Sequence, residues 1–188
     1  MPVSARTTRI AKLAVIPAAL AVSGLIVATS SYSAFSATTD NAGNSWATGT
    51  VALTDDDKGA ALFEATNLKP GATGTKCITV TSKGSLPADV RLYAQDSTTT
   101  KALNQYINVT VAESATCDAT NKQNIFNGTL ENFGTKSTFA AGNGAWATAG
   151  TPDESRAYTI SYTLDNATPD TAQGGTAGVK FVWEAQNK

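Results

Sequence analysis

The sequence predicts an all-β domain built as a two-sheet sandwich with one short helix. Short segments with apolar residues at alternate positions recur along the chain, and this is the period of a half-buried strand. Turns rich in Gly, Pro, Asn and Asp separate the segments. The apolar positions are mainly Val, Ile, Phe, Tyr and Trp, which favour strands. Several short strands at this spacing are typical of a sandwich.

The first 33 residues have the pattern of a secretory signal peptide. The basic residues that lead it are Arg6, Arg9 and Lys12. An uncharged apolar run follows at 13–28, and the small residues Ser31 and Ser33 predict cleavage between Ser33 and Ala34. The alternative is an uncleaved N-terminal anchor, although the run is short beside the roughly 20 residues of a membrane span.

Residues 34–188 then remain, which is about the length of one domain. Three of the 14 basic residues lie in the signal, whereas all 15 acidic residues follow it. The remaining basic residues are dispersed, so we expect no nucleic-acid partner, which would need a clustered basic face. The signal predicts a protein that is exported from the cytoplasm, with no stable membrane span after cleavage.

We expect residues 34–43 to be a flexible N-terminal segment and residues 44–188 to be the folded sandwich domain. The segment is small and polar, with Phe35 as its one large apolar side chain, so it has little surface of its own to bury. An extended segment of this kind can add to an exposed sheet edge in a neighbouring subunit. A mobile tail or a first strand folded back on its own domain are the alternatives. The candidate donor residues are Ala34, Phe35, Ser36, Ala37, Thr38 and Thr39.

The first half of the domain is expected to contain strands at 46–54, 61–66 and 75–82. Between the last two, Pro70 fixes φ and Gly71 permits the positive φ of a type II turn. The run Asp55, Asp56 and Asp57 offers oxygen ligands for Ca²⁺ but lacks the spacing of a known calcium loop. We therefore favour a solvated turn there.

The second half is expected to contain strands at 88–95, 107–112, 156–164 and 178–185. Residues 98–106 are the one expected helix, and 117–133 has no regular pattern. Residues 140–153 read as a long Gly-rich and Ala-rich loop around Trp146. Trp146 is the candidate surface contact, because Trp46 and Trp183 fall within strand patterns and are expected in the core.

The two cysteines, Cys77 and Cys117, would meet an oxidising compartment after export. One intramolecular disulfide is the default expectation, worth about 3 to 4 kcal/mol by loop-closure entropy. A buried thiol pair, or an exposed thiol that crosslinks subunits, remains open.

The sequence contains no histidine, and this excludes the common catalytic sites that depend on an imidazole. It therefore has no H-E-x-x-H motif and no imidazole for a Ser or Cys triad. We expect no enzymatic activity, no catalytic or metal site and no cofactor.

The order of segments resembles the TasA/camelysin family of bacterial secreted proteins that form biofilm-matrix fibres. The matching segments are Tyr32-Ser33-Ala34-Phe35, the strand 46–53, Asn67-Leu68-Lys69-Pro70-Gly71, Gly84-Ser85-Leu86, Leu103-Asn104-Gln105-Tyr106 before 107–111, and the final strand 179–185. They span essentially all of residues 34–188. The cysteine pair, the shorter chain and the Ser-rich end of the signal depart from the family pattern.

The resemblance implies a jelly-roll sandwich, processing by a signal peptidase of the SipW type, and assembly into fibres by donor-strand exchange. We therefore predict a secreted structural subunit that assembles head to tail into a homo-oligomeric filament through its N-terminal segment. The alternative function is a monomeric surface adhesin or carbohydrate-binding module that uses Trp146.

Overall fold

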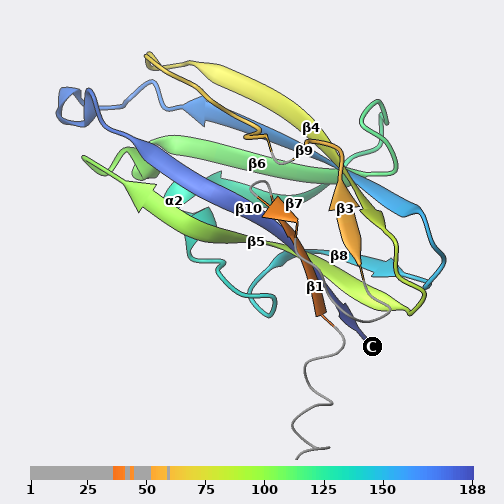
Figure 1. Cartoon of the computed structure of the whole chain (residues 1–188). Coiled ribbons are helices and arrows are strands. Elements are labelled where there is room, and N and C mark those ends of the chain that lie inside the picture. Colours follow the sequence, from red (N-terminus) through yellow and green to blue (C-terminus); the bar gives the residue numbers. More distant parts are fainter. Residues whose placement is uncertain (1–35, 41–42, 45–51, 59) are drawn as a thin grey trace, which may run out of the picture. The chain divides into compact units, whose positions relative to one another are not determined.

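The computed structural model describes residues 36–40, 43–44, 52–58 and 60–188, which form two five-stranded antiparallel sheets (Figure 1). In spatial order, sheet A contains β2 (Gly43–Asn44), β1 (Ser36–Asp40), β10 (Ala177–Asn187), β5 (Ala88–Thr99) and β8 (Asn143–Thr148). Sheet B contains β3 (Leu53–Asp55), β4 (Thr73–Ser82), β9 (Glu154–Leu164), β6 (Ile107–Ser114) and β7 (Gln123–Thr129). The predicted all-β class with two sheets and one short helix is confirmed.

The core lies between the two sheets, where alternate residues of each strand point inward. Ile78 and Ile160 of sheet B and Leu92 of sheet A are at most 1% exposed. Tyr158 of β9 and Trp183 of β10 bridge the sheets, with ring centroids 5.4 Å apart. Each large apolar side chain buried in this way contributes roughly 1.5 to 3 kcal/mol. The expected place of Trp183 in the core is confirmed.

The expected helix at 98–106 is wrong. β5 continues to Thr99, and Lys101 and Ala102 have φ of +52° and +53°, which no right-handed helix accommodates. Only a 3₁₀ turn, Leu103–Gln105, follows. Within the described residues the α-helix is instead α2, Leu130–Gly134, in the segment that had no regular pattern. It is too short to show a helical period, but its N-cap Thr129 accepts a hydrogen bond from the backbone N–H of Asn132 at 3.2 Å.

Two further expectations about strands are corrected. Residues 61–66 are described and are not a strand, while 143–148, inside the expected loop, form β8. Gly and Ala have low strand propensity, so the sequence of β8 shows no alternation of large apolar residues from which a strand could be predicted. Of the expected strand at 46–54, residues 45–51 lie outside the described residues, and β3 includes its end.

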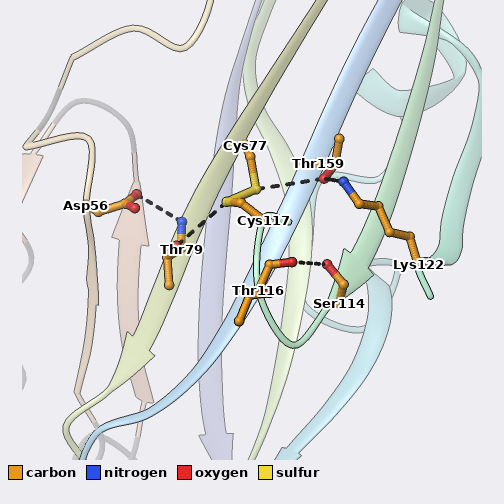
Figure 2. The surroundings of a disulfide bond; sticks show 8 residues. All are labelled: Asp56, Cys77, Thr79, Ser114, Thr116, Cys117, Lys122 and Thr159. Atoms are coloured by element: carbon orange, nitrogen blue, oxygen red, sulfur yellow. Dashed lines mark hydrogen bonds between the residues drawn. A yellow bond between two sulfur atoms is a disulfide. The ribbon is translucent and has the colours of Figure 1, made fainter. Parts of the chain in front are cut away.

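The expected disulfide is present between Cys77 of β4 and Cys117 of the β6–β7 loop (Figure 2). Because β9 lies between β4 and β6, this bond holds the loop across the outer face of sheet B. The hydroxyl of Thr159 on β9 donates to Cys77 Sγ at 3.7 Å and accepts from Lys122 Nζ at 2.9 Å. The disulfide therefore stabilises both the loop and the order of three strands.

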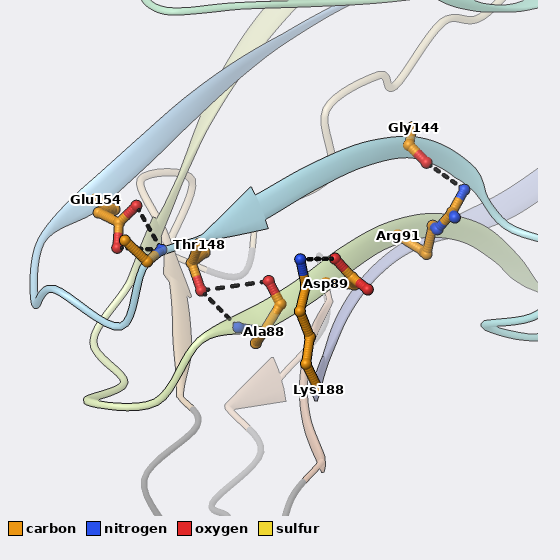
Figure 3. A network of polar contacts seen from close by, with 8 residues as sticks. Ala88, Asp89, Arg91, Gly144, Thr148, Glu154 and Lys188 are labelled. Carbon is orange, nitrogen blue, oxygen red and sulfur yellow. Dashed lines mark hydrogen bonds and ion pairs between the residues drawn. The ribbon is translucent and has the colours of Figure 1, made fainter.

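Side-chain hydrogen bonds secure β8 at the edge of sheet A (Figure 3). Thr148 Oγ1 accepts from the backbone N–H of Ala88 at 3.1 Å, and the Glu154 carboxylate accepts from the N–H groups of Ala149 and Thr151. At the C-terminal end, Lys188 Nζ lies 3.1 Å from Asp89 Oδ1. These polar contacts hold β8 in place, although its sequence has no alternating apolar pattern.

Candidate functional site

The candidate donor residues lie partly in a strand of the same chain. Ser33, Ala34 and Phe35 are outside the described residues, so cleavage and the Phe35 anchor stay predictions. Ser36–Asp40 form β1, which pairs antiparallel with β10. The pairing runs from Ser36 opposite Gln186 to Asp40 opposite Val182. In the structure the described part of the segment thus occupies an edge of its own domain.

β1 covers only part of β10. A hairpin turns the chain so that Gly43 lies opposite Asp40 and Asn44 opposite Thr39, as β2. β10 itself begins at Ala177, whereas β1 pairs with its residues 182–186. On the other side β5 pairs with β10 along most of its length, with a register shift between Gly178 and Lys180.

In sheet B, strand β4 is likewise covered only in part on one side. β3 pairs only with residues 80–82 of β4, so residues 73–79 have β9 as their one strand partner within the described part of the chain. The described residues of the connection between β3 and β4 form no strand on this edge. At its start Asp56 Oδ1 accepts a hydrogen bond from the Thr79 N–H at 2.9 Å.

The end of that connection is the predicted type II turn, which is confirmed. The Ala72 N–H donates to the Lys69 carbonyl at 2.9 Å, and Gly71 has φ of +82°. The Gly71 N–H also donates to the carbonyl of Leu164 at 2.8 Å, at the far end of β9. Both ends of the connection are therefore fixed, and we call its middle part, residues 60–68, the strap.

A groove of about 1280 Å³ lies between the strap and the inner surfaces of the two sheets. Its apolar lining includes Phe63, Leu103, Ile160, Tyr162, Val179 and Phe181. The Phe63 ring meets the Tyr162 ring edge to face at 5.2 Å. A Cβ at Gly74 would lie 2.4 Å from Tyr162 Cε1, so glycine is required there for the tyrosine to lie over β4. The groove exceeds the roughly 300 to 1,000 Å³ of small-molecule pockets.

Trp146 is not the surface contact that the sequence suggested. It lies in β8, is 3% exposed, and has the Arg156 guanidinium 5.9 Å from its ring centroid. The expectation failed because residues 143–148 form a strand that points Trp146 into the core. The alternative function as a glycan-binding module loses its candidate residue.

Glu113 is an inward-pointing acid in the same part of the core. It is 9% exposed, and its Oε2 has no hydrogen-bond partner within the described residues. Burial raises the pKa of the Glu113 carboxyl above its ordinary value, and the charge of Arg156 offsets only part of this. Burial also raises the pKa of Tyr158, and the charge of Glu113 adds to that rise.

No group of three or more His, Cys, Asp or Glu side chains gathers within the described residues. Asp56, one of the three aspartates considered for calcium, instead hydrogen-bonds the β4 edge. Among the helices of the described chain, none is long and apolar enough to cross a membrane.

Comparison with known proteins gives a family match. A family model described as camelysin metallo-endopeptidase matches residues 8–148. Among solved structures, Spo0M, a sporulation control protein from Bacillus subtilis, is similar at 15% identity with a TM-score of 0.28. That match covers 70% of this chain and 42% of that chain, so this chain spans less than half the length of Spo0M. No curated protein matches this chain significantly.

Proposed function

This chain belongs to the camelysin family, and from that premise we propose that it is a secreted structural subunit of an extracellular matrix or cell-surface fibre. It is exported by its signal peptide, and a signal peptidase of the SipW type frees Ala34 as the new N-terminus. It then assembles head to tail with further copies of itself. It has no enzymatic activity and needs no cofactor.

The observation that supports assembly is the edge pairing of β1 with β10. β1 is the N-terminal described strand, and its five paired positions with β10 lie along one edge. The β1 of a neighbouring copy could make the same backbone hydrogen bonds to β10 in the same register. Exchange would therefore replace the contacts within one copy by equivalent contacts between two copies. Each copy would give its β1 to one neighbour and receive the β1 of another. Such a contact joins two different surfaces, is therefore heterologous, and propagates as a filament.

The family description names a metallo-endopeptidase, and the residues present do not fit that chemistry. The chain contains no histidine, so it cannot supply the two imidazoles of an H-E-x-x-H site. The described acidic residues do not gather into an alternative ligand set. We therefore expect purified protein, free of host proteases, to leave casein intact with or without a chelator.

Electron microscopy tests assembly directly. Protein beginning at Ala34 should form filaments, whereas protein that lacks residues 34–43 should not. Because the deletion also removes β1, a second test keeps the chain complete. Cysteines at Ser36→Cys and Gln186→Cys should join neighbouring copies and give a ladder of disulfide-linked multimers on a non-reducing gel. Crosslinks confined to monomers would contradict exchange.

A further inference from the structure

The disulfide between Cys77 and Cys117 lies on the outer face of sheet B, where dissolved thiols can reach it (Figure 2). Both cysteines are half-buried, and Cys77 alternates along β4 with the fully buried Ile78. The bond joins β4 to a loop, residues 115–122, that leaves the end of β6 and passes over β9. A disulfide outside the core is open to exchange, whereas one inside it is protected.

The loop depends on this bond to stay on the sheet. Residues 115–122 include no large apolar side chain, and most of them are exposed. Ser114 Oγ donates a hydrogen bond to the Thr116 carbonyl at 2.9 Å, and Lys122 Nζ donates to Thr159 Oγ1 on β9 at 2.9 Å. Opening the disulfide should therefore free the loop, while β4 and β6 keep their backbone pairing with β9.

The sulfur of Cys77 has surroundings that favour negative charge. The Thr159 hydroxyl donates to Cys77 Sγ at 3.7 Å, and Lys122 Nζ donates to the same hydroxyl at 2.9 Å. A hydroxyl that accepts from an ammonium group is a stronger donor to its own acceptor. A nearby cation also favours the thiolate form of a cysteine. The pair Thr159 and Lys122 thus stabilises the thiolate that Cys77 becomes when the bond opens.

The sulfur of Cys117 has weaker support for negative charge. Thr79 Oγ1 lies 4.0 Å from Cys117 Sγ, which is a long contact even for sulfur. The backbone N–H of the same threonine donates to the carboxylate of Asp56, and Asp118 follows Cys117 in the chain. Acids on this side disfavour a second negative charge. Cys77 is therefore the better leaving group of the two.

We propose that this disulfide exchanges with small thiols at Cys117 and thereby controls whether the loop lies on sheet B. The thiolate of the small molecule attacks Cys117 Sγ, the bond between the two cysteines breaks, and its electron pair leaves on Cys77 as a thiolate. Cys117 then carries a mixed disulfide, and residues 115–122 leave the sheet.

A second thiol molecule completes the reduction. It attacks the mixed disulfide and releases Cys117 as a thiol, so two small thiols are oxidised to one disulfide while the protein takes up two electrons and two protons. The proposal does not depend on fibre assembly, because one copy of the chain contains all the groups that it uses.

Peptide mapping tests which sulfur is attacked. The oxidised chain beginning at Ala34 is treated briefly with reduced glutathione, quenched with excess N-ethylmaleimide and digested. We expect glutathione on Cys117 and the maleimide on Cys77. Glutathione mainly on Cys77 would overturn the assignment of the two sulfurs.

The rate of reduction tests whether the folded protein leaves the disulfide reactive. Dithiothreitol should reduce the folded chain at a rate within about tenfold of that for the same chain unfolded in guanidinium, because the fold protects the bond little. Reduction of the folded chain that is slower by much more than this factor would show a protected disulfide and overturn the proposal.

Variants of Thr159 and Lys122 test the support of the Cys77 thiolate. Thr159→Val removes the hydroxyl and should slow reduction by dithiothreitol several-fold, whereas Thr159→Ser keeps a hydroxyl and should react as the parent does. Lys122→Ala should also slow reduction. Lys76→Ala is the matched control, because Lys76 precedes Cys77 but points to the opposite face of the sheet. Thr159→Val or Lys122→Ala reduced at the parent rate or faster would overturn the role of that residue.

Limited digestion with trypsin reports the position of the loop. Cleavage after Lys122 should rise about tenfold once the cysteines are reduced and alkylated, because a loop released from the sheet opens to proteases. Cleavage after Lys101, an exposed lysine between β5 and β6, is the internal control and should stay constant. No rise at Lys122 would overturn release of the loop. An equal rise at both lysines would show general loosening of the domain and would overturn it too.

Discussion

The carboxylate of Asp56 accepts a hydrogen bond from the backbone N–H of Thr79 over 2.9 Å, immediately after β3 ends. An open strand edge is a hazard because its unpaired amides can pair with other chains. Asp56 satisfies the first such amide that β3 leaves behind. A side chain therefore continues the protection of the β4 edge beyond the last paired strand residue.

Replacing Asp56 with Ala should lower the free energy of unfolding by about 1 kcal/mol, because one hydrogen bond of an exposed carboxylate is lost. The midpoint of urea unfolding measures the change. Asp56→Asn keeps an acceptor oxygen and should lose less. If Asp56→Ala unfolded at the same urea concentration as the parent protein, the hydrogen bond from Thr79 to Asp56 would not contribute to stability.

Replacing both Cys77 and Cys117 with Ser should lower the free energy of unfolding by about 3 to 4 kcal/mol. The disulfide closes a loop with a sequence separation of 40, and that constraint on the unfolded chain is lost. Guanidinium unfolding with and without reductant measures it. The parent protein should respond to reductant and the double variant should not; an unchanged parent would contradict the prediction.

Gly74→Ala should destabilise the domain by about 1 to 3 kcal/mol, since the new Cβ would overlap Tyr162, whose Cε1 lies 2.4 Å from its position. Thermal unfolding measures the loss. Combining it with Tyr162→Ala should recover part of the loss, because the overlap disappears. Thr73→Ala, at an exposed neighbouring position, is the control. If Gly74→Ala lost as much stability in the Tyr162→Ala background as in the parent protein, overlap with Tyr162 would not be the cause.

Trp146→Ala should cost about 3 to 5 kcal/mol of stability, because it empties a buried site and removes the ring beneath Arg156. Trp146→Phe should cost less. Chemical unfolding measures both variants, with Ala147→Ser, the exposed neighbour, as the control. A Trp146→Ala variant as stable as the parent would contradict the burial of this residue.

The buried Glu113 should make stability depend on pH. Its folded-state pKa is raised above the ordinary value of 4.5, so its contribution is fully present below that value and is lost as pH rises through the folded pKa. The stability of Glu113→Gln relative to the parent should therefore increase from pH 4 to pH 8. Arg156 and Tyr158 on β9 are the other ionisable groups of this cluster.

Unfolding midpoints of both proteins across that pH range measure this effect. Glu64→Gln alters an exposed acid and should follow the parent at every pH. A difference between Glu113→Gln and the parent that stays constant with pH would show that the carboxyl titrates alike in both states.

Local pattern predicted those parts of the fold that bury an apolar face. β4, β6, β9 and β10 were expected near their observed places because their alternating residues point into the core. The turn at Pro70 and Gly71 was predicted because only a few residue types permit its backbone angles. β8 and α2 were missed, since polar caps such as Thr129 and Glu154 define them more than any hydrophobic period does.

The sequence by itself determined an all-β domain behind a signal-like segment, a cysteine pair suited to a disulfide, and the lack of histidine chemistry. These properties depend on residue types and short-range periodicity. Only the tertiary structure decided that Trp146 is buried, that β1 pairs with residues 182–186 of β10, and that the strap lines an apolar groove. The reason is physical: strand order and register arise from contacts between residues far apart in the chain, and no local pattern contains them.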